Sequence, residues 1–363
     1  MRAKRGNLVA PAAGDVCLLN MNLFKRLSSH RLFWPLTALA LLLLFNLFFT
    51  KGFFAFDIRQ GHLYGYVIDI LKWGSVVTAV ALGMTLVIAT GGIDLSVGSV
   101  MAVSGGIAAA LVTREEGPVN FGLVVAAALG ACTLAGIWNG ILVGYAGIQP
   151  FVATLILMVA GRGIAQLICG ALILTFDGHK SFEALYGAHV LGLPLCILIV
   201  LGLFVLTVIL TRKTAIGMFI EAVGNNETAS RFAGINARMV KVLVYGFSGF
   251  CAGVAGLVAA SSIRGADSNK AGLMFELYAI FSVVVGGTSL SGGRFTLAGS
   301  LVGALLYQTL RTTMYAHGVP SDVTPAYLAV VIVTVCLLQS TEFRRMIRHP
   351  LQKIRRGPKR EST

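Results

Sequence analysis

Long apolar runs that are almost free of charge constrain this chain more than any other feature of its sequence. They recur from "LFWPLTALALLLLFNLFF" (32–49) to a last run that ends near residue 340, and many are about 17 residues or longer. Runs of this length and composition are typical of helices that cross a lipid bilayer. Charged residues make up only 12% of the chain, whereas a soluble domain carries about a quarter. The runs therefore predict an all-α, polytopic membrane protein.

About ten transmembrane helices are predicted, within one membrane domain at 32–340. The first run is too long for a signal-peptide core and is interpreted as a retained helix. A basic tail precedes the domain at 1–31, and a second basic tail follows it at 341–363. The predicted spans are 32–49, 73–90, 95–112, 121–144, 150–172, 190–210, 242–260, 277–293, 296–310 and 325–340.

The distribution of basic residues predicts the orientation of the chain. With the N-terminus in the cytoplasm, the two tails, the segment 211–241 and Arg294 lie inside, and together they hold 20 of the 29 Lys and Arg residues. Cytoplasmic loops carry such an excess, so both termini are expected in the cytoplasm. The net charge of +14 needs no nucleic acid partner, because the basic tails would favour anionic membrane lipids instead.

Sequence signals of enzymes are missing. The chain has no phosphate-binding loop, no HExxH and no GxSxG. Its six histidines lie outside the apolar runs, so no metal site is predicted, and its cysteines suit helix packing. Glycines four apart, as at Gly136 and Gly140, allow close helix packing, either within one copy or against a second copy. These features favour a non-catalytic membrane protein without a bound cofactor.

The basic segment 211–241 contains a short predicted helix, "ETASRFA". Asn225 or Asn226 can cap its start, Glu227 suits its first turn, and Gly234 can end it. A helix of about two turns is marginal alone in water. The segment is therefore expected to dock on the rest of this protein or on a partner, or else to be a solvated connector.

Two similar glycine-rich stretches interrupt the apolar runs. "TGGIDLSVG" (90–98) contains Asp94, and "GGTSLSGG" (286–293) repeats the pattern without the acid. One interpretation is a pair of helix breaks that line a transport pathway, since irregular backbone at membrane depth needs protein or water around it. The other is a tight turn at the cytoplasmic surface, in which the carboxylate of Asp94 caps the next helix.

A small set of polar and aromatic residues falls within the predicted spans. Asn139, Thr154, Arg162 and Gln166 could bind sugar hydroxyl groups, and Phe151 could stack on the sugar ring. Hydrogen bonding between helices is the alternative, with Arg162 held by a backbone carbonyl or by Asp94.

Four segments, present in this order, resemble the permease subunits of ribose-type ABC sugar importers: "GMTLVIATGGIDLSVGSVMA", "QPFVATLILMVAGRG", "GMFIEAVGNNETASRFAGI" and "VVVGGTSLSGGRFTLAGSLVGALL". The resemblance extends from about residue 71 to 340. Within this family the chain is most similar to galactofuranose importers, notably in "IRGADSNKAG" and "GGRF".

The resemblance implies a bacterial inner-membrane permease that works with three kinds of partner. A second permease copy, identical or paralogous, would complete the pathway, a separate ATPase would bind ATP and Mg²⁺, and a periplasmic binding protein would deliver the sugar. The residues expected to contact the ATPase are Glu221, Gly224, Asn225, Glu227, Ala229, Arg231 and Gly234. The outer segment 261–276 would meet the binding protein through Arg264, Asp267, Lys270 and Glu276, or be a solvated loop.

Two other kinds of function stay open at this point. A permease of the same type could move another small polar solute, such as a different pentose or hexose. A membrane enzyme that acts on a lipid-linked sugar belongs to another class and would need paired carboxylates or a metal cluster. One position also departs from the family, which usually has an acid where this chain has Tyr278.

Overall fold

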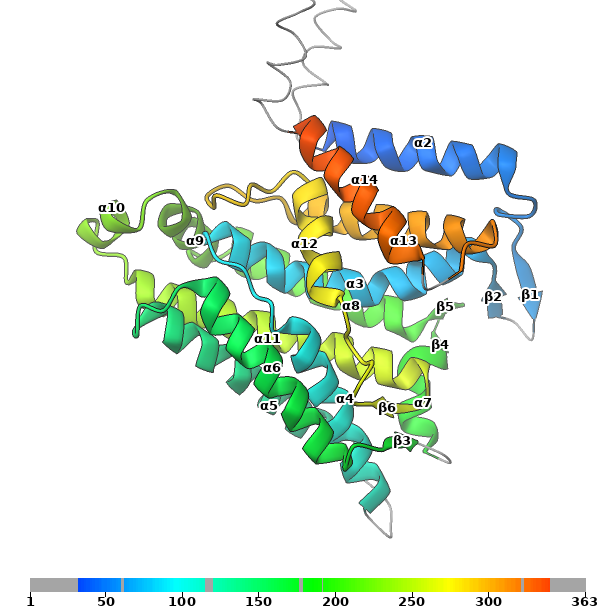
Figure 1. The fold of residues 1–363 in the computed structure, drawn as a ribbon, viewed down its shortest axis with the longest axis horizontal. Coiled ribbons are helices and arrows are strands. Elements are labelled where there is room, and N and C mark those ends of the chain that lie inside the picture. Colours follow the sequence, from blue (N-terminus) through cyan, green and yellow to red (C-terminus); the bar gives the residue numbers. More distant parts are fainter. Residues whose placement is uncertain are drawn as a thin grey trace, which may run out of the picture.

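The structure is a computed structural model that describes residues 32–59, 62–114, 120–175, 179–190, 192–320 and 323–339. The two basic tails lie outside the described residues. The described chain is mostly helical (Figure 1). Its apolar helices are α2 (Phe33–Phe49), α3 (Tyr66–Ala89), α4 (Val97–Arg114), α5 (Phe121–Gly144), α6 (Pro150–Cys169), α8 (Leu195–Arg212), α11 (Ala237–Ser262), α12 (Phe275–Val285), α13 (Leu297–Ala316) and α14 (Thr324–Gln339).

Each predicted span contains one of these apolar helices. Among the described residues, five helices are long and apolar enough to cross a membrane, namely α3, α5, α6, α8 and α11. Three boundaries differ from the prediction by six residues or more, among them the end of α13, which lies at Ala316 rather than at 310. Helix α3 begins at Tyr66 rather than near 73, and α12 ends at Val285, so the stretch 286–293 is a loop rather than the end of a span. Gly287, Gly292 and Gly293 in that loop all have positive φ, which a helix does not accommodate.

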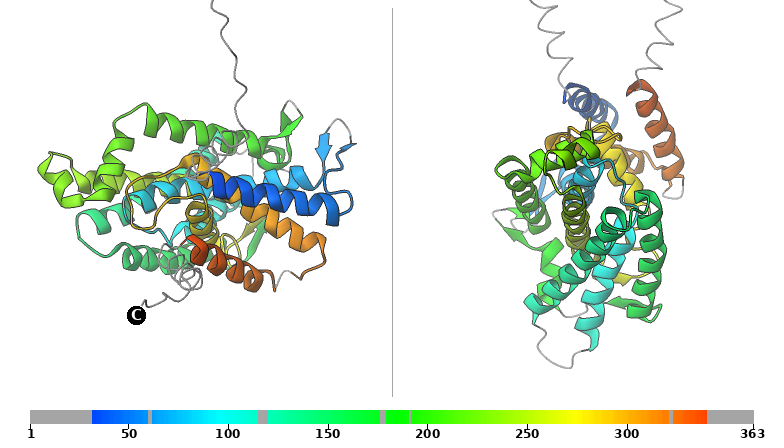
Figure 2. Two further views of the ribbon diagram at one scale, coloured as in Figure 1. Left: turned by 90° about the horizontal axis from the view of Figure 1, so that it is seen from above. Right: turned by 90° about the vertical axis from the view of Figure 1, so that its left-hand side faces the viewer.

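Short elements lie at opposite ends of the helical bundle. The helices α9 (Ile216–Asn225) and α10 (Glu227–Phe232) extend from one end, as Figure 1 and the left view of Figure 2 show. The other end carries helix α7 (Lys180–Gly187) and three small antiparallel sheets. These pair β1 (Asp57–Arg59) with β2 (His62–Tyr64), β3 (Ile173–Thr175) with β6 (Gly265–Asp267), and β4 (His189–Val190) with β5 (Leu193–Pro194).

Helices α3 and α11 form the centre of the bundle. Most of their residues are buried, whereas α5, α6 and α8 leave many apolar side chains exposed. An apolar outer surface around a buried core is what a lipid environment favours. This arrangement supports the prediction of a membrane protein.

Glycines bring α5 against α11. A Cβ atom built on Gly136 would overlap the carbonyl oxygen of Tyr245, and one built on Gly140 would lie 2.6 Å from the Cα atom of Val242. Side chains at these positions would push the two helices apart. The small-residue pattern therefore allows close packing within one copy, which was one of the two interpretations of the sequence.

Candidate functional site

Helix α10 is short but well defined at both ends. The side chain of Asn226 accepts a hydrogen bond from the amide of Ala229 at 2.9 Å, and the hydroxyl of Ser230 donates to the Asn226 carbonyl at 2.8 Å. Gly234 follows the helix with a φ of +85°. The predicted cap residue and helix end are thus confirmed, with Asn226 rather than Asn225 as the cap.

The acid in the first turn of α10 fixes this helix to α11. The carboxylate of Glu227 accepts hydrogen bonds from Arg231, one turn further along α10, and from the ammonium of Lys241 on α11 at 2.7 Å. The hydrogen bond from Lys241 is the largest cause that lowers the pKa of Glu227 below its ordinary value. Lys241 therefore connects α10 to α11, and Arg231 pairs with the same carboxylate within α10.

One large apolar side chain lies outside this ion pair network. Phe232 at the end of α10 is 89% exposed, more than any other large apolar residue in the described chain. Its neighbours Ala229, Arg231 and Gly234 are exposed as well. Phe232 was not among the residues predicted from the sequence, because a single aromatic residue between Arg231 and Ala233 suggests helix packing. Its exposed position beyond the bundle is visible only in the structure.

Gly224, at the end of α9, joins this segment to both glycine-rich stretches. A Cβ atom built on Gly224 would overlap the carbonyl oxygen of Ala89 and lie 2.5 Å from the amide nitrogen of Gly293. That amide also donates to the Ala89 carbonyl at 2.9 Å. The two similar stretches, almost 200 positions apart in the sequence, therefore meet, and the segment 216–234 presses its backbone against them.

Asp94 lies inside the bundle. Its Oδ1 atom accepts from the amide and the hydroxyl of Ser96, at 3.0 and 2.6 Å, and its Oδ2 atom accepts from the Ser248 hydroxyl at 2.8 Å. Ser248 is eleven residues into α11, about 16 Å along the helix. The tight-turn interpretation predicted this contact, in which the carboxylate of Asp94 binds Ser96 at the start of α4. The turn is nevertheless buried, not at the surface, since Asp94 is 1% exposed.

Two other predicted residues belong to the same buried network. The amide nitrogen of Asn139 donates to the Ser96 hydroxyl at 2.9 Å, and the Thr154 hydroxyl donates to the Ile93 carbonyl at 3.3 Å. The hydroxyl of Tyr245 also reaches the Ile93 carbonyl, at 3.4 Å. These contacts are hydrogen bonds between elements of the fold, which was the alternative to a sugar site.

The other three predicted pathway residues lie elsewhere. Arg162 donates to the carbonyl oxygens of Ser268 and Ala271, and Gln166 donates to the Asn269 side chain at 2.8 Å. Arg162 and Gln166 therefore fasten the loop that follows β6 to helix α6. Phe151 on α6 is 50% exposed and is not part of either network. The six predicted residues thus do not converge on one site.

The predicted outer-face charges have different surroundings. Arg264 is exposed and lies 3.5 Å from the Glu183 carboxylate. Asp267 accepts two backbone amides of its own turn, those of Asn269 and Lys270, and Lys270 is exposed. Glu276 lies partly buried in the first turn of α12. Arg264 and Lys270 are therefore the two of these charges that are exposed for a contact.

Apolar helices around a buried polar turn, with an exposed, capped helical segment at one end, define a polytopic membrane permease. Residues 66–339 match the family described as "branched-chain amino acid transport system / permease component". The chain belongs to this family.

Known relatives cover most of the chain. The galactofuranose transporter permease protein YtfT of Escherichia coli is 47% identical over 88% of this chain and 94% of its own length. The fructose import permease protein FruF of Bifidobacterium longum is 42% identical over 90% and 92%, respectively. The ribose import permease protein RbsC of Escherichia coli is 37% identical over 75% and 84%. No solved structure matches the chain.

Proposed function

We propose that this chain is the permease subunit of an ABC importer that moves a monosaccharide, galactofuranose or a related sugar, across the inner membrane. Its relatives include permeases named for galactofuranose, fructose and ribose, which favours a sugar over an amino acid. The highest identity among these three is to the galactofuranose permease. A permease for another small polar solute is the second candidate, since sugars of different ring size occur among the relatives.

The observation that carries this proposal is the contact of Gly224 with Ala89 and Gly293. Because these are backbone contacts with no flexible side chain between them, a displacement of the exposed helix α10 would be transmitted to the connections α3–α4 and α12–α13. A separate ATPase that binds ATP and Mg²⁺ would supply that displacement. The contact residues would be Glu221, Gly224, Asn225, Glu227, Ala229, Arg231 and Gly234, together with Phe232.

The membrane arrangement follows from the same proposal. All ten apolar helices would cross the membrane or enter it, with both termini and the segment 211–241 in the cytoplasm. The sheets at the opposite end would then face the periplasm, where Arg264 and Lys270 would meet a sugar-binding protein. A second permease copy would pack against the exposed apolar helices.

Reconstitution of the importer tests this function. We expect labelled D-galactose to enter proteoliposomes only when the ATPase, ATP, Mg²⁺ and the binding protein are all present. Uptake by the permease alone, driven by an ion gradient, would contradict the proposal. Conversion of a lipid-linked sugar by the purified chain would indicate a membrane enzyme instead.

Phe232→Ser tests the docking surface within that system. Because Phe232 is 89% exposed, its loss leaves the folded permease unchanged. An apolar anchor in a partner's groove typically dominates binding, so we expect affinity for the ATPase to fall at least tenfold. Surface-immobilised permease gives the affinity, and Leu193→Ser at the opposite end is the control. Equal loss in both variants would contradict ATPase docking at α10.

A further inference from the structure

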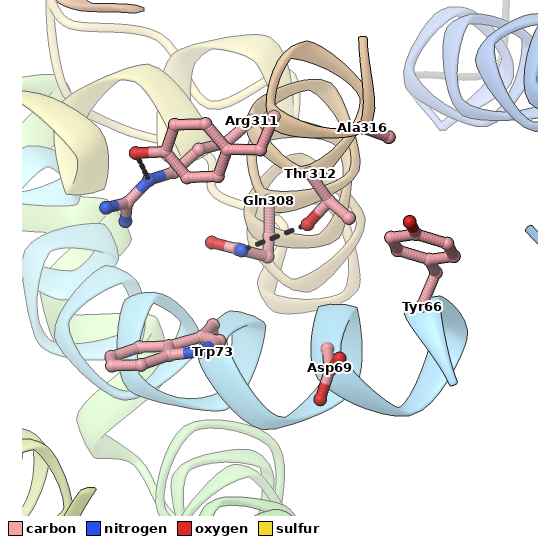
Figure 3. Close-up of a pocket in the computed structure, with 8 residues that line it drawn as sticks. Tyr66, Asp69, Trp73, Gln308, Arg311, Thr312 and Ala316 are labelled. Carbon is pink, nitrogen blue, oxygen red and sulfur yellow. Dashed lines mark hydrogen bonds between the residues drawn. The ribbon is translucent and has the colours of Figure 1, made fainter. Parts of the chain in front are cut away.

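A cavity of about 450 Å³ with both polar and aromatic walls lies between the first half of α3 and the last half of α13, away from the networks described above. Figure 3 shows its walls, with Tyr66, Asp69 and Trp73 on α3 facing Gln308, Arg311 and Thr312 on α13. It lies toward the end of the bundle that carries the small sheets, because α3 begins directly after β2. None of the site residues predicted from the sequence lines it.

Helical spacing brings these side chains together. Asp69 and Trp73 are four residues apart on α3, and Gln308 and Thr312 are four apart on α13, so each pair shares one helix face. Both faces point into the same space (Figure 3). An indole face opposite amide, hydroxyl, carboxylate and guanidinium groups offers an apolar surface for a sugar ring and hydrogen-bond partners for its hydroxyls.

One buried side chain in the cavity wall, Gln308, has a hydrogen-bond acceptor without a donor among the described residues. Gln308 is 4% exposed, and its amide nitrogen donates weakly to the Thr312 hydroxyl at 3.3 Å. Its amide oxygen is buried and accepts no hydrogen bond from a described residue. A buried acceptor without a donor is costly. Rotation about the last bond of the side chain, which has a broad energy profile, would turn this oxygen toward a hydroxyl donor in the cavity.

The charges of the cavity favour a neutral ligand. The guanidinium of Arg311 donates through Nε to the Tyr315 hydroxyl at 3.1 Å, which leaves its terminal nitrogens for other acceptors. Asp69 on the facing helix forms no ion pair with Arg311 in the described chain. The cavity wall itself holds one acid and one base, on opposite sides, and Lys72 on α3 lies near enough to Asp69 to interact with its charge. A molecule that both donates and accepts hydrogen bonds without net charge suits them better than an anion or a cation.

Trp73 connects this cavity to a second one. It also lines an apolar space of about 310 Å³ with Met101, Gly256 and Phe275, deeper among α4, α11 and α12. Trp73 is therefore the shared wall between a polar space and an apolar space. A sugar held on the indole in the first space is one side chain away from the second.

We propose that the cavity between α3 and α13 is a monosaccharide-binding site of the permease, with Trp73 as the stacking surface and Gln308 as the central hydrogen-bond partner. The proposal rests on the proposed function of the chain as a sugar permease. It assigns sugar contact to α3 and α13, and not to Asn139, Thr154 and Arg162, whose amide nitrogen, hydroxyl and guanidinium, respectively, hydrogen-bond other parts of the fold.

Fluorescence of a single tryptophan tests binding directly. The chain contains three tryptophans, so the double variant Trp34→Phe, Trp138→Phe leaves Trp73 as the only one. In nanodiscs, we expect D-galactose, D-fructose or D-ribose to change its emission saturably. Gln308→Leu in the same background should raise the sugar concentration at half-saturation at least tenfold. A response no larger than that to glycine betaine at equal osmolality, or an unchanged titration in Gln308→Leu, would overturn the proposal.

Uptake by the complete importer separates this proposal from the function itself. We expect Trp73→Ala and Gln308→Leu to lower uptake at least fivefold and to change the ratio between two labelled sugars, while the binding protein still stimulates ATP hydrolysis. Thr309→Val on α13 and the unmodified importer are the controls, and this variant should transport normally. If the unmodified importer moves no sugar, the proposed function fails. If it does and both cavity variants match the controls, only the cavity proposal fails.

Discussion

The two glycine-rich stretches have almost the same sequence but different roles in the structure. When "GGIDLSVG" (91–98) is aligned with "GGTSLSGG" (286–293), Asp94 corresponds to Ser289. Asp94 is buried and accepts three hydrogen bonds, whereas Ser289 is exposed and exchanges a hydrogen bond with Ser291 two residues away. One acid therefore separates a turn anchored inside the bundle from a loop that lies at its surface.

The two stretches differ in the contacts that hold them. The first stretch is tied by side chains to α4, α5 and α11, so it follows the interior of the bundle. The second is held at its end by backbone contacts with Ala89 and with Gly224 on α9. Movement of the segment 216–234 would therefore reach the second stretch directly, and the first stretch through Ala89 at the end of α3.

Gly224→Ala should have the largest effect. A Cβ atom at this position would overlap the Ala89 carbonyl and lie 2.5 Å from the Gly293 amide, and backbone cannot yield cheaply. We expect ATP-driven uptake to fall more than tenfold, because α9 must move away from both stretches. Uptake and ATP hydrolysis measured in the same proteoliposomes check this.

Gly202→Ala is the matched control for that variant. Gly202 lies in α8, where a Cβ atom would meet nothing within 4 Å, and alanine favours a helix over glycine. Its uptake should equal that of the unmodified protein. Normal uptake by Gly224→Ala as well would show that the close backbone contact is not needed for coupling.

An exchange at the aligned pair should have the next largest effect. Asp94→Ser shortens the side chain and leaves the buried Ser248 hydroxyl without its acceptor, which costs about 1–3 kcal/mol of unfolding free energy. Ser289→Asp adds a charge at an exposed position and should change it by less than about 0.5 kcal/mol. Thermal unfolding of both variants in detergent gives the two values. Similar values would mean that the acid does not distinguish the stretches.

The sequence predicted the helical bundle and the local signals within it. The apolar runs predicted the position of each apolar helix of the described residues. The cap at Asn226 and the helix end at Gly234 were predictable because they depend on neighbouring residues in the sequence. The end of α12 was misplaced because "GGTSLSGG" carries no charge that would mark the end of a span. Its positive φ angles are a property of the folded backbone.

The candidate site was only partly predictable, because it depends on contacts between distant residues. No periodic pattern brings Gly224 beside Ala89, or Trp73 opposite Gln308. The polar residues selected from the spans were chosen by type, and the structure instead connects Asn139 and Arg162 to separate parts of the fold. A residue's type gives its chemistry, whereas its partners follow from helix packing.

Lowering the pH should have the smallest effect and should reach only one of the two stretches. Hydrogen bonding from Lys241 lowers the pKa of Glu227 below its ordinary value of 4.5. The stabilisation by this ion pair is therefore complete above that value and is lost as the pH falls through the lowered pKa of the folded state. Since the Glu227 carboxylate is 34% exposed, the change should be below about 1 kcal/mol.

Hydrogen exchange can detect this loosening when each pH is compared with a Glu227→Gln reference, because the ratio removes the intrinsic pH dependence of exchange. At neutral pH we expect amides 229–236 to exchange more slowly in the unmodified protein than in the variant. The difference should vanish in acid. Amides 93–97 should exchange alike in both proteins throughout, because Ser96 and Ser248 hold that turn independently of α10. Amides 287–293 of the second stretch should instead follow Glu227, and protection of 93–97 that also follows Glu227 would mean that the two stretches respond as one unit.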